Sequence, residues 1–202
     1  MTQELLDQAI VTLQNGGVVL LATDTVLGLV AQPSRSDAVD KVYALKQRPR
    51  QKNLPIMVAH ADQITALGGQ LTPSAQALLN SDLMPGPLTL AIALDPTCTP
   101  KWLSGRNECA IRIPQDDFLL SILTKLGPLM VTSANLSGQD TAQTTQLALM
   151  QLNGVPDLVV HGTAKSQAPS TLVNCTTVPP RFERVGAIPK QRITTILEQA
   201  ND

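Results

Sequence analysis

Aromatic side chains are scarce in this sequence of 202 residues, and neither sign of charge is in excess. The four aromatic residues are Tyr43, Trp102, Phe118 and Phe182. Four rings are too few for the base-stacking surfaces of single-stranded nucleic-acid binders. The 15 Lys and Arg residues are balanced by 16 Asp and Glu residues, so the formal net charge of −1 creates no general attraction for nucleic acid. Any anion site must therefore be built locally.

Cysteines, histidines and long apolar runs are also rare. Cys98, Cys109 and Cys175 contain no C-x-x-C pair, which argues against a disulfide framework and favours a reducing compartment. The two histidines have no closely spaced zinc-ligand partners. The longest apolar run, 18–22, is far shorter than the ~20 residues that span a bilayer, and the acidic N-terminus is unlike a signal peptide. We expect a cytoplasmic protein with no membrane partner.

The composition is that of a globular protein, with 43% hydrophobic and 15% charged residues. The length favours one domain covering residues 1–202, because domains average about 150 residues. Thr2 and Ser36 are expected to cap the first two helices.

Helical and strand patterns alternate along most of the chain, which predicts an α/β or mixed sheet. Three strands near the C-terminus follow one another without a helix, so part of the sheet is expected to be antiparallel. The predicted helices cover 3–15, 36–47, 72–79, 115–126, 144–152 and 190–199. The predicted strands cover 18–22, 56–59, 88–94, 109–113, 129–131, 157–160, 171–175 and 181–185.

Polar loops follow several of these strands, where ligands of open α/β sheets tend to bind. Thr23, Asp24 and Thr25 come directly after the first strand and either hold a ligand or bond their own turn. The segment 46–52 carries four cations and no acid, which suits a polyphosphate or a solvated loop. There, Arg48 is expected to fork onto a phosphate, with Lys46 and Lys52 as point charges.

Two further loops offer hydroxyl and amide groups. Residues 132–138 are predicted to form a polar loop after a short strand, and residues 169–171 open another strand. Arg112 interrupts an otherwise apolar strand and needs a partner if it is buried. A substrate carboxylate and an ion pair with Asp116 or Asp117 are both open for it.

Seven segments, taken in order, resemble the YrdC/TsaC family, the threonylcarbamoyl-AMP synthases. Family members carry P-T-D/E-T-x-Y/F-G-L, K-x-R-P, P-G-P-x-T, R-x-P, S-A-N-x-S-G, P-S-T and R-x-G-A-I. The corresponding segments here are 22–29, 46–49, 85–89, 112–114, 133–138, 169–171 and 184–188. The resemblance runs from Val18 to Ile188 and is to the short, single-domain bacterial form.

The resemblance implies a twisted mixed parallel and antiparallel sheet with helices on its faces, lining a large concave site. It also implies an enzyme, a nucleotidyltransferase that forms threonylcarbamoyl-AMP and pyrophosphate from L-threonine, bicarbonate and ATP with Mg²⁺. The product serves threonylcarbamoyladenosine modification of tRNA through downstream transferase proteins. Contact with tRNA or other RNA remains open, and so does a resident metal.

The family roles map onto matching residues of this chain. Lys46, Arg48, Ser133 and Asn135 correspond to the K-x-R and S-x-N tetrad, taken as catalytic. The residues implied to contact L-threonine are Thr25, Arg112, Ser133 and Ser170, with Arg112 on the carboxylate. Those implied to contact ATP are Arg48, Lys52, Asn135 and Arg184.

The sequence departs from the family pattern at three positions. Ala22 replaces a proline, Leu27 replaces an aromatic residue, and Asn53 stands where a proline commonly follows the basic loop. Proteins that resemble this family leave two alternatives open: a YciO-like paralogue that binds a nucleotide but uses another substrate, and a double-stranded-RNA-binding or ribosome-maturation module.

Overall fold

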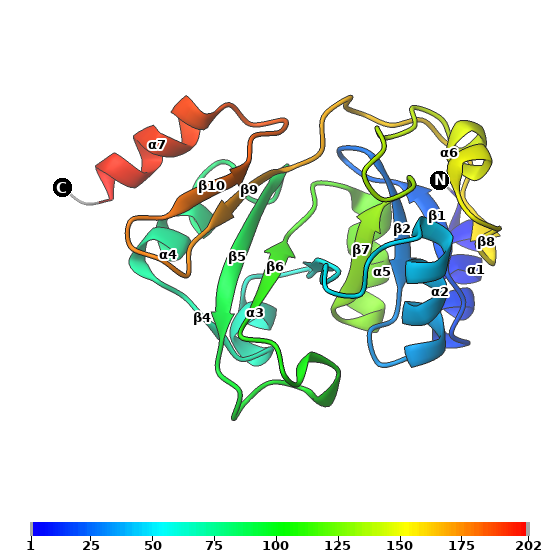
Figure 1. Ribbon diagram of the computed structural model, residues 1–202, viewed down its shortest axis with the longest axis horizontal. Helices are drawn as coiled ribbons and strands as arrows, with labels where there is room; N and C mark the ends of the chain where they lie inside the picture. The colour runs from blue at the N-terminus through cyan, green and yellow to red at the C-terminus, as the bar shows by residue number, and fades with distance from the viewer. Residues whose placement is uncertain (1, 201–202) are drawn as a thin grey trace.

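The computed structural model describes residues 2–200 and contains one mixed ten-stranded sheet with helices packed on its faces (Figure 1). Met1 and Asp202, the expected domain limits, lie outside the described residues. The strand order is β10-β9-β5-β6-β3-β7-β2-β1-β8, and β4 pairs with β5. The strands are β1 (Val19–Ala22), β2 (Leu27–Ala31), β3 (Ile56–Met57), β4 (Gly69–Gln70), β5 (Leu88–Leu94), β6 (Glu108–Arg112), β7 (Leu129–Ser133), β8 (Leu158–Val159), β9 (Thr171–Asn174) and β10 (Arg181–Arg184).

Several helices start at a residue whose side chain caps the first turn. Oγ1 of Thr2 accepts a hydrogen bond from the Leu5 amide at the start of the first helix, and Asp116 does the same for the Leu119 amide. Gly127, with φ 79°, ends the latter helix. The helices are α1 (Gln3–Gln14), α2 (Ser36–Lys46), α3 (Asp62–Ala66), α4 (Pro73–Leu79), the 3₁₀ turn η1 (Lys101–Leu103), α5 (Asp117–Leu126), α6 (Thr145–Gln151) and α7 (Lys190–Gln199).

The half of the sheet around β1, β2 and β7 is covered on both faces. Val19 and Leu21 of β1 pack with α1 and α5, whereas Leu20 packs with α2 and α6 on the other face. Successive strand residues point to opposite faces, so a strand covered on both faces is apolar along its whole length. This explains the continuous apolar run of β1.

The other half of the sheet, around β5, β6 and β9, is covered on one face. Leu88 and Leu90 of β5 belong to the core formed with α3, α4 and α7. Thr89, between them, points to the opposite face, where it lines a cavity. The open face of this half therefore meets the β1–β2 turn and the end of β7 across the cavity. In Figure 1, β5 and β6 lie to the left of β7, β2 and β1.

The predicted mixed α/β fold is confirmed, with local differences. Strand β2 was not predicted, because it follows β1 after a turn of only four residues. The short elements α3 and β4 were not predicted either. Ser36 is the first helical residue, and the capping position belongs to Arg35, which makes no side-chain cap. Thr132 and Ser133 extend β7 instead of starting a loop.

The C-terminal strands are only partly antiparallel to each other. β9 and β10 pair antiparallel, as expected. β8 lies at the opposite edge of the sheet, parallel to β1. The pairing of β8 with β1 is set by tertiary packing. The short sequence separation between β8 and β9 suggested instead that these two strands are neighbours.

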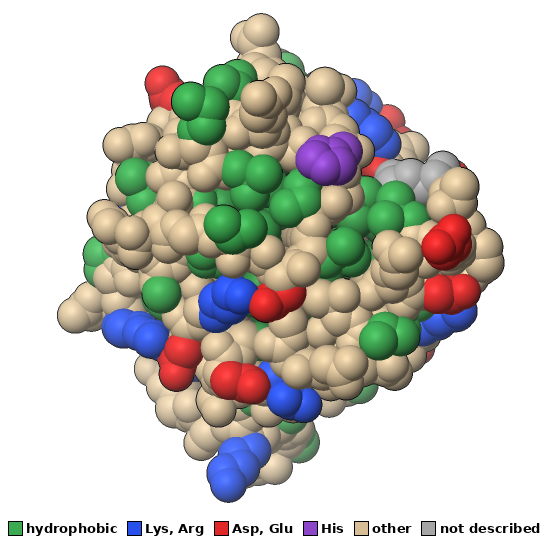
Figure 2. Space-filling model, turned by 90° about the vertical axis from the view of Figure 1, so that its right-hand side faces the viewer, with side chains coloured by type: hydrophobic (Ala, Val, Ile, Leu, Met, Phe, Trp, Pro, Cys, Tyr) green, Lys and Arg blue, Asp and Glu red, His purple; other side chains and the backbone are tan. Residues whose placement is uncertain are grey.

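The face that carries α6 and β8 mixes apolar side chains with ion pairs (Figure 2). Leu147 and Met150 of α6 and the following Val155 are exposed there, and Lys41 pairs with Asp157 at 2.6 Å. Within residues 2–200, no helix has the length and apolar character needed to cross a membrane.

Candidate active site

A cavity of about 210 Å³ lies between the two halves of the sheet. The β1–β2 turn, the loop after α2, and the ends of β6, β7 and β9 all contribute to its wall. Its lining residues are Thr23, Thr25, Val26, Leu27, Gly28, Arg48, Asn53, Pro55, Met57, Thr89, Ala110, Arg112, Val131, Thr132, Ser133, Pro169, Ser170, Leu172 and Arg184.

Arg112 is the most enclosed cation of this wall, with 4% of its side chain exposed. Its Nε donates to the carbonyl oxygen of Gly86 at 2.9 Å, and its Nη1 donates to Oγ1 of Thr25 at 2.9 Å. Its Nη2 donates to Oδ2 of Asp24 at 2.6 Å. Burial lowers the pKa of Arg112, and the Asp24 carboxylate acts against that shift. These bonds fix the plane of the guanidinium within the cavity wall.

Of the two alternatives for Arg112, the ion pair is observed, but Asp116 and Asp117 are wrong as its partners. Asp116 instead caps α5 and accepts a hydrogen bond from Lys165 at 2.8 Å. The true partner, Asp24, lies 88 residues away in the sequence. Sequence proximity favoured the acids just after β6, but the chain turns away into α5 and carries them out of reach.

The β1–β2 turn is partly held by its own hydroxyl groups, as one of the two interpretations predicted. Thr23 Oγ1 donates to the carbonyl oxygen of Val26 at 2.8 Å and accepts from the Thr25 amide at 3.1 Å. Asp24 does not bond its own turn. Its Oδ2 binds Arg112, and its Oδ1 is buried without a hydrogen-bond partner among the described residues.

Ser170 and Thr89 meet on the opposite wall. Their hydroxyl oxygens are 2.7 Å apart. Arg184 donates from Nε to the carbonyl oxygen of Ser170 at 3.0 Å and from Nη2 to its hydroxyl at 3.2 Å. Thr89 was not predicted as a site residue, although its place between two inward-facing leucines of β5 marks it as facing the other side.

The guanidinium groups of the cavity influence one another. Loss of solvent, followed by the charges of Arg112 and Arg48, lowers the pKa of Arg184. Burial likewise lowers the pKa of Arg48. Within residues 2–200, neither Arg48 nor Arg184 forms an ion pair. The cavity is therefore cationic, and an anion bound in it would relieve the unfavourable field.

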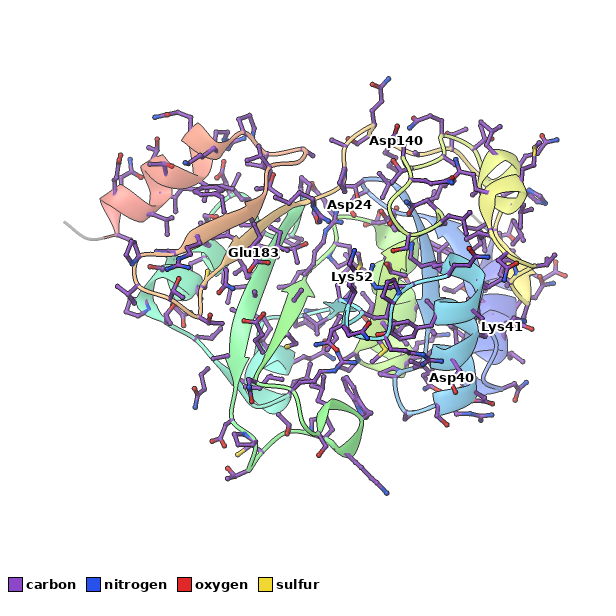
Figure 3. The ribbon with its side chains drawn as sticks, viewed as in Figure 1. Asp24, Asp40, Lys41, Lys52, Asp140 and Glu183 are labelled. Carbon is purple, nitrogen blue, oxygen red and sulfur yellow. The ribbon has the colours of Figure 1, made fainter. Side chains whose placement is uncertain are left out.

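The loop after α2 presents Arg48 to the cavity. Its Nε donates to the carbonyl oxygen of Lys52, and its Nη2 to that of Asn53, both at 2.9 Å. Lys52 itself is exposed and does not line the cavity. Figure 3 shows it on this loop, between the two halves of the molecule. Of the cations on this loop, Arg48 alone lines the cavity among the described residues.

Lys46 points into the protein, contrary to the expectation of an open point charge. Its side chain is 1% exposed. The ammonium donates to the carbonyl oxygens of Ser133 and Asn135, the latter at 2.8 Å, and to Oδ1 of Asn135 at 3.2 Å. Burial, reinforced by the charge of Arg48, lowers its pKa to about 7. Lys46 is thus a tie between α2 and the loop after β7.

Asn135 is bonded on both sides of its amide. Besides accepting from Lys46, it donates from Nδ2 to the carbonyl oxygens of Leu136 at 3.0 Å and Gln139 at 2.5 Å. It lies outside the cavity wall, whereas Ser133 lines it. The S-x-N segment therefore contributes one residue to the cavity and one to the tie beneath it.

The sequence matches the Sua5/YciO/YrdC family, described as telomere recombination, over residues 11–186. The chain belongs to this family. It is 31% identical over 193 residues to the threonylcarbamoyl-AMP synthase of Bacillus subtilis, covering 94% of this chain and 56% of the relative. Identity to the enzyme of that name from Yersinia enterocolitica is 35% over 150 residues, covering 72% and 78%. The chain thus spans a little over half of the Bacillus relative.

The fold of this chain is similar to that of a solved structure, Sua5 from P. abyssi complexed with L-threonine. The TM-score is 0.87 at 25% identity, covering 97% of this chain and 58% of that one. The Sua5/YciO/YrdC segments recognised in the sequence converge on the cavity described above. The predicted site residues that line it are Thr25, Arg48, Arg112, Ser133, Ser170 and Arg184, and those that do not are Lys46, Lys52 and Asn135.

Several residues that line this Sua5/YciO/YrdC cavity are aliphatic. Leu27, at the position where the family pattern has an aromatic residue, is 1% exposed and lines the cavity, as do the aliphatic side chains of Met57, Val131 and Leu172. All lining residues are described, and none is aromatic. A flat group entering here would meet methyl and methylene groups, without a ring on which to stack.

Proposed function

We propose that this chain is a threonylcarbamoyl-AMP synthase, which forms threonylcarbamoyl-AMP and pyrophosphate from L-threonine, bicarbonate and ATP. The observation that carries the proposal is the meeting of three guanidinium groups and several hydroxyls in one cavity. Arg48 and Arg184 are without carboxylate partners among residues 2–200, whereas Arg112 is held by Asp24. Two uncompensated cations suit a polyphosphate, and the names of the relatives support this assignment.

The proposed reaction joins three substrates without a covalent enzyme intermediate. The threonine amine and bicarbonate form a carbamate with loss of water. A carbamate oxygen then attacks the α-phosphorus of ATP, and pyrophosphate leaves. Positioning and charge stabilisation supply most of the catalysis in such phosphorus chemistry. Magnesium would enter with ATP, as part of the substrate.

The residues of the wall divide between the two organic substrates. Arg48 and Arg184 would face the phosphates as charge builds on the leaving pyrophosphate. Arg112 would receive the threonine carboxylate with the N–H groups not donated to the protein. The hydroxyls of Thr25, Ser133 and Ser170 would bond the amino acid. Lys46 and Asn135 would act from beneath, by holding Ser133 in place.

The test is to incubate the purified protein with ATP, magnesium, L-threonine and bicarbonate. We expect threonylcarbamoyl-AMP by mass spectrometry and an equal amount of pyrophosphate, both lost when threonine or bicarbonate is omitted. Nucleotide binding without product would contradict the proposal and favour a paralogue with another substrate. Tight RNA binding that falls steeply with salt, again without product, would favour an RNA-binding module.

A further inference from the structure

Strand β10, at the edge of the sheet beside β9, contains an irregularity just before Arg184 (Figure 1). The two strands pair antiparallel, with Phe182 opposite Val173 and Arg184 opposite Leu172. Two steps along β10 therefore match one step along β9, so Glu183 is the extra residue of a β-bulge. Bulges of this kind change the direction in which the following side chain points.

The bulge decides which face of the sheet Arg184 occupies. Val173 belongs to the core formed with α4 and α7, and Phe182 packs against that core, whereas Leu172 lines the cavity on the other face. Residues two apart in a regular strand share a face, so without the bulge Arg184 would follow Phe182 to the core side. The extra residue shifts this alternation by one. Arg184 consequently joins Leu172 on the cavity wall.

A single buried hydroxyl group holds the chain that follows the bulge. Thr171 of β9 is 0% exposed, and its Oγ1 donates to the carbonyl oxygen of Ile188 at 2.6 Å. The same oxygen accepts from the amide of Gly186 at 2.9 Å and from the amide of Ile188 at 3.1 Å. A hydroxyl has one donor and two acceptor lone pairs, so these bonds use its full capacity. The Ala187 amide adds a bond to the carbonyl oxygen of Pro169 at 2.9 Å.

These bonds restrict where the guanidinium of Arg184 can reach. Gly186, two residues after Arg184, is bonded to Thr171, and Arg184 itself donates to the carbonyl and hydroxyl oxygens of Ser170. Removing the Thr171 hydroxyl would deprive two amide groups and one carbonyl group of their partner. Polar groups that lose a partner inside a protein are costly, which favours a shift of the segment.

We propose that Thr171 is a positioning residue, whose hydroxyl fixes the chain after the β10 bulge so that Arg184 faces the phosphates of ATP. This inference rests on the proposed function and deepens it, because it identifies what holds a phosphate-binding guanidinium in the cavity. Thr171 is not one of the residues that line the cavity. Its influence on ATP binding should therefore pass through Arg184, which can be tested by combining variants.

The test is isothermal titration calorimetry with MgATP. Arg184→Met should lower the affinity about tenfold or more, the effect of losing one charge-assisted phosphate contact. Thr171→Val keeps the side-chain shape without the hydroxyl and should lower the affinity about fivefold or more. Thr171→Ser keeps the hydroxyl and should stay within about twofold of the unmodified protein. In the Arg184→Met background, Thr171→Val should change the affinity by no more than about twofold.

Thr145→Val is the matched control, because it also removes a buried hydroxyl. Thr145 is 3% exposed and lies on α6, over the other half of the sheet, where its hydroxyl accepts from the Gly162 amide at 3.4 Å. This variant should bind MgATP as the unmodified protein does. A similar loss of affinity in Thr145→Val and Thr171→Val would reduce the effect of Thr171 to general destabilisation and overturn the inference.

Other outcomes would also overturn the inference. Equal MgATP affinity of the unmodified protein and Arg184→Met would do so even if Thr171→Val fails to fold, and so would absence of MgATP binding by the unmodified protein. A Thr171→Val variant that is folded by circular dichroism and binds normally is a further such outcome, as is a loss that persists in the Arg184→Met background. MgATP binding without threonylcarbamoyl-AMP formation would contradict the proposed function alone.

Discussion

The Lys46 ammonium lies 2.8 Å from the carbonyl oxygen of Asn135, at 1% exposure, and ties the end of α2 to the loop after β7. The tie is reciprocal, because the Ser137 amide donates to the carbonyl oxygen of Lys46 at 2.8 Å. Ser133, the last residue of β7, also accepts a hydrogen bond from the Lys46 ammonium and lines the cavity. A cation that the sequence suggests for phosphate binding thus holds two segments of the site together.

The buried Lys46 makes stability depend on pH. Its pKa is about 7 in the folded protein against an ordinary value of 10.5. Between these values the unfolded chain binds a proton that the folded protein has released, so the free energy of unfolding rises with pH, by up to about 1.4 kcal/mol per unit. Urea unfolding at pH 7, 8 and 9 should show this rise for the unmodified protein relative to Lys46→Met. Parallel curves would contradict the prediction.

Arg48→Ala should abolish most activity without unfolding the protein. Arg48 is half-buried, and its loss removes a phosphate contact of about 1.5–3 kcal/mol, which corresponds to roughly 10- to 100-fold in turnover. Arg50→Ala is the control on the same loop, because Arg50 is exposed and pairs with Asp40. Pyrophosphate release measures both variants. Equal rates for them would remove Arg48 from the proposed mechanism.

Arg112→Met should destabilise the protein by about 3 kcal/mol or more, because it leaves Asp24 buried without its partner. The variant should also need more L-threonine to reach half-maximal rate. Urea unfolding and a threonine titration measure the two effects. The double variant Arg112→Met with Asp24→Leu should recover part of the stability but not the threonine response. Recovery of both would make the pair purely structural.

Gly186→Ala should disturb the wall that carries Ser170. A Cβ at this position would collide with the backbone carbonyl oxygen of Pro169 and the backbone of Ser170. We expect a loss of about 1–3 kcal/mol in stability and a lower activity, since overpacking forces the backbone to shift. Gly162→Ala is the control, because its Cβ would meet only Cβ of Ala22 at 3.4 Å. Thermal unfolding of both variants gives the comparison, and equal melting temperatures would count against the collision.

Local elements were largely predictable from the sequence. Strand β5 has the predicted bounds, and α1 and α7 differ by no more than one residue. Caps such as Thr2 and stops such as Gly127 act within one helical turn, so they can be read from neighbouring residues. The family segments also named the six predicted residues that line the cavity.

Only the tertiary structure decided which of the polar residues face the cavity and which face one another. Sequence spacing predicts contacts within about four residues on a helix, but Arg112 and Asp24 lie 88 residues apart and Lys46 and Asn135 lie 89 apart. The residue type alone does not tell whether a charged side chain faces solvent, a substrate or a carbonyl group. Its role follows from the dielectric and the partners that folding places around it, which is why Lys46 became a tie and Asp24 a buried acceptor.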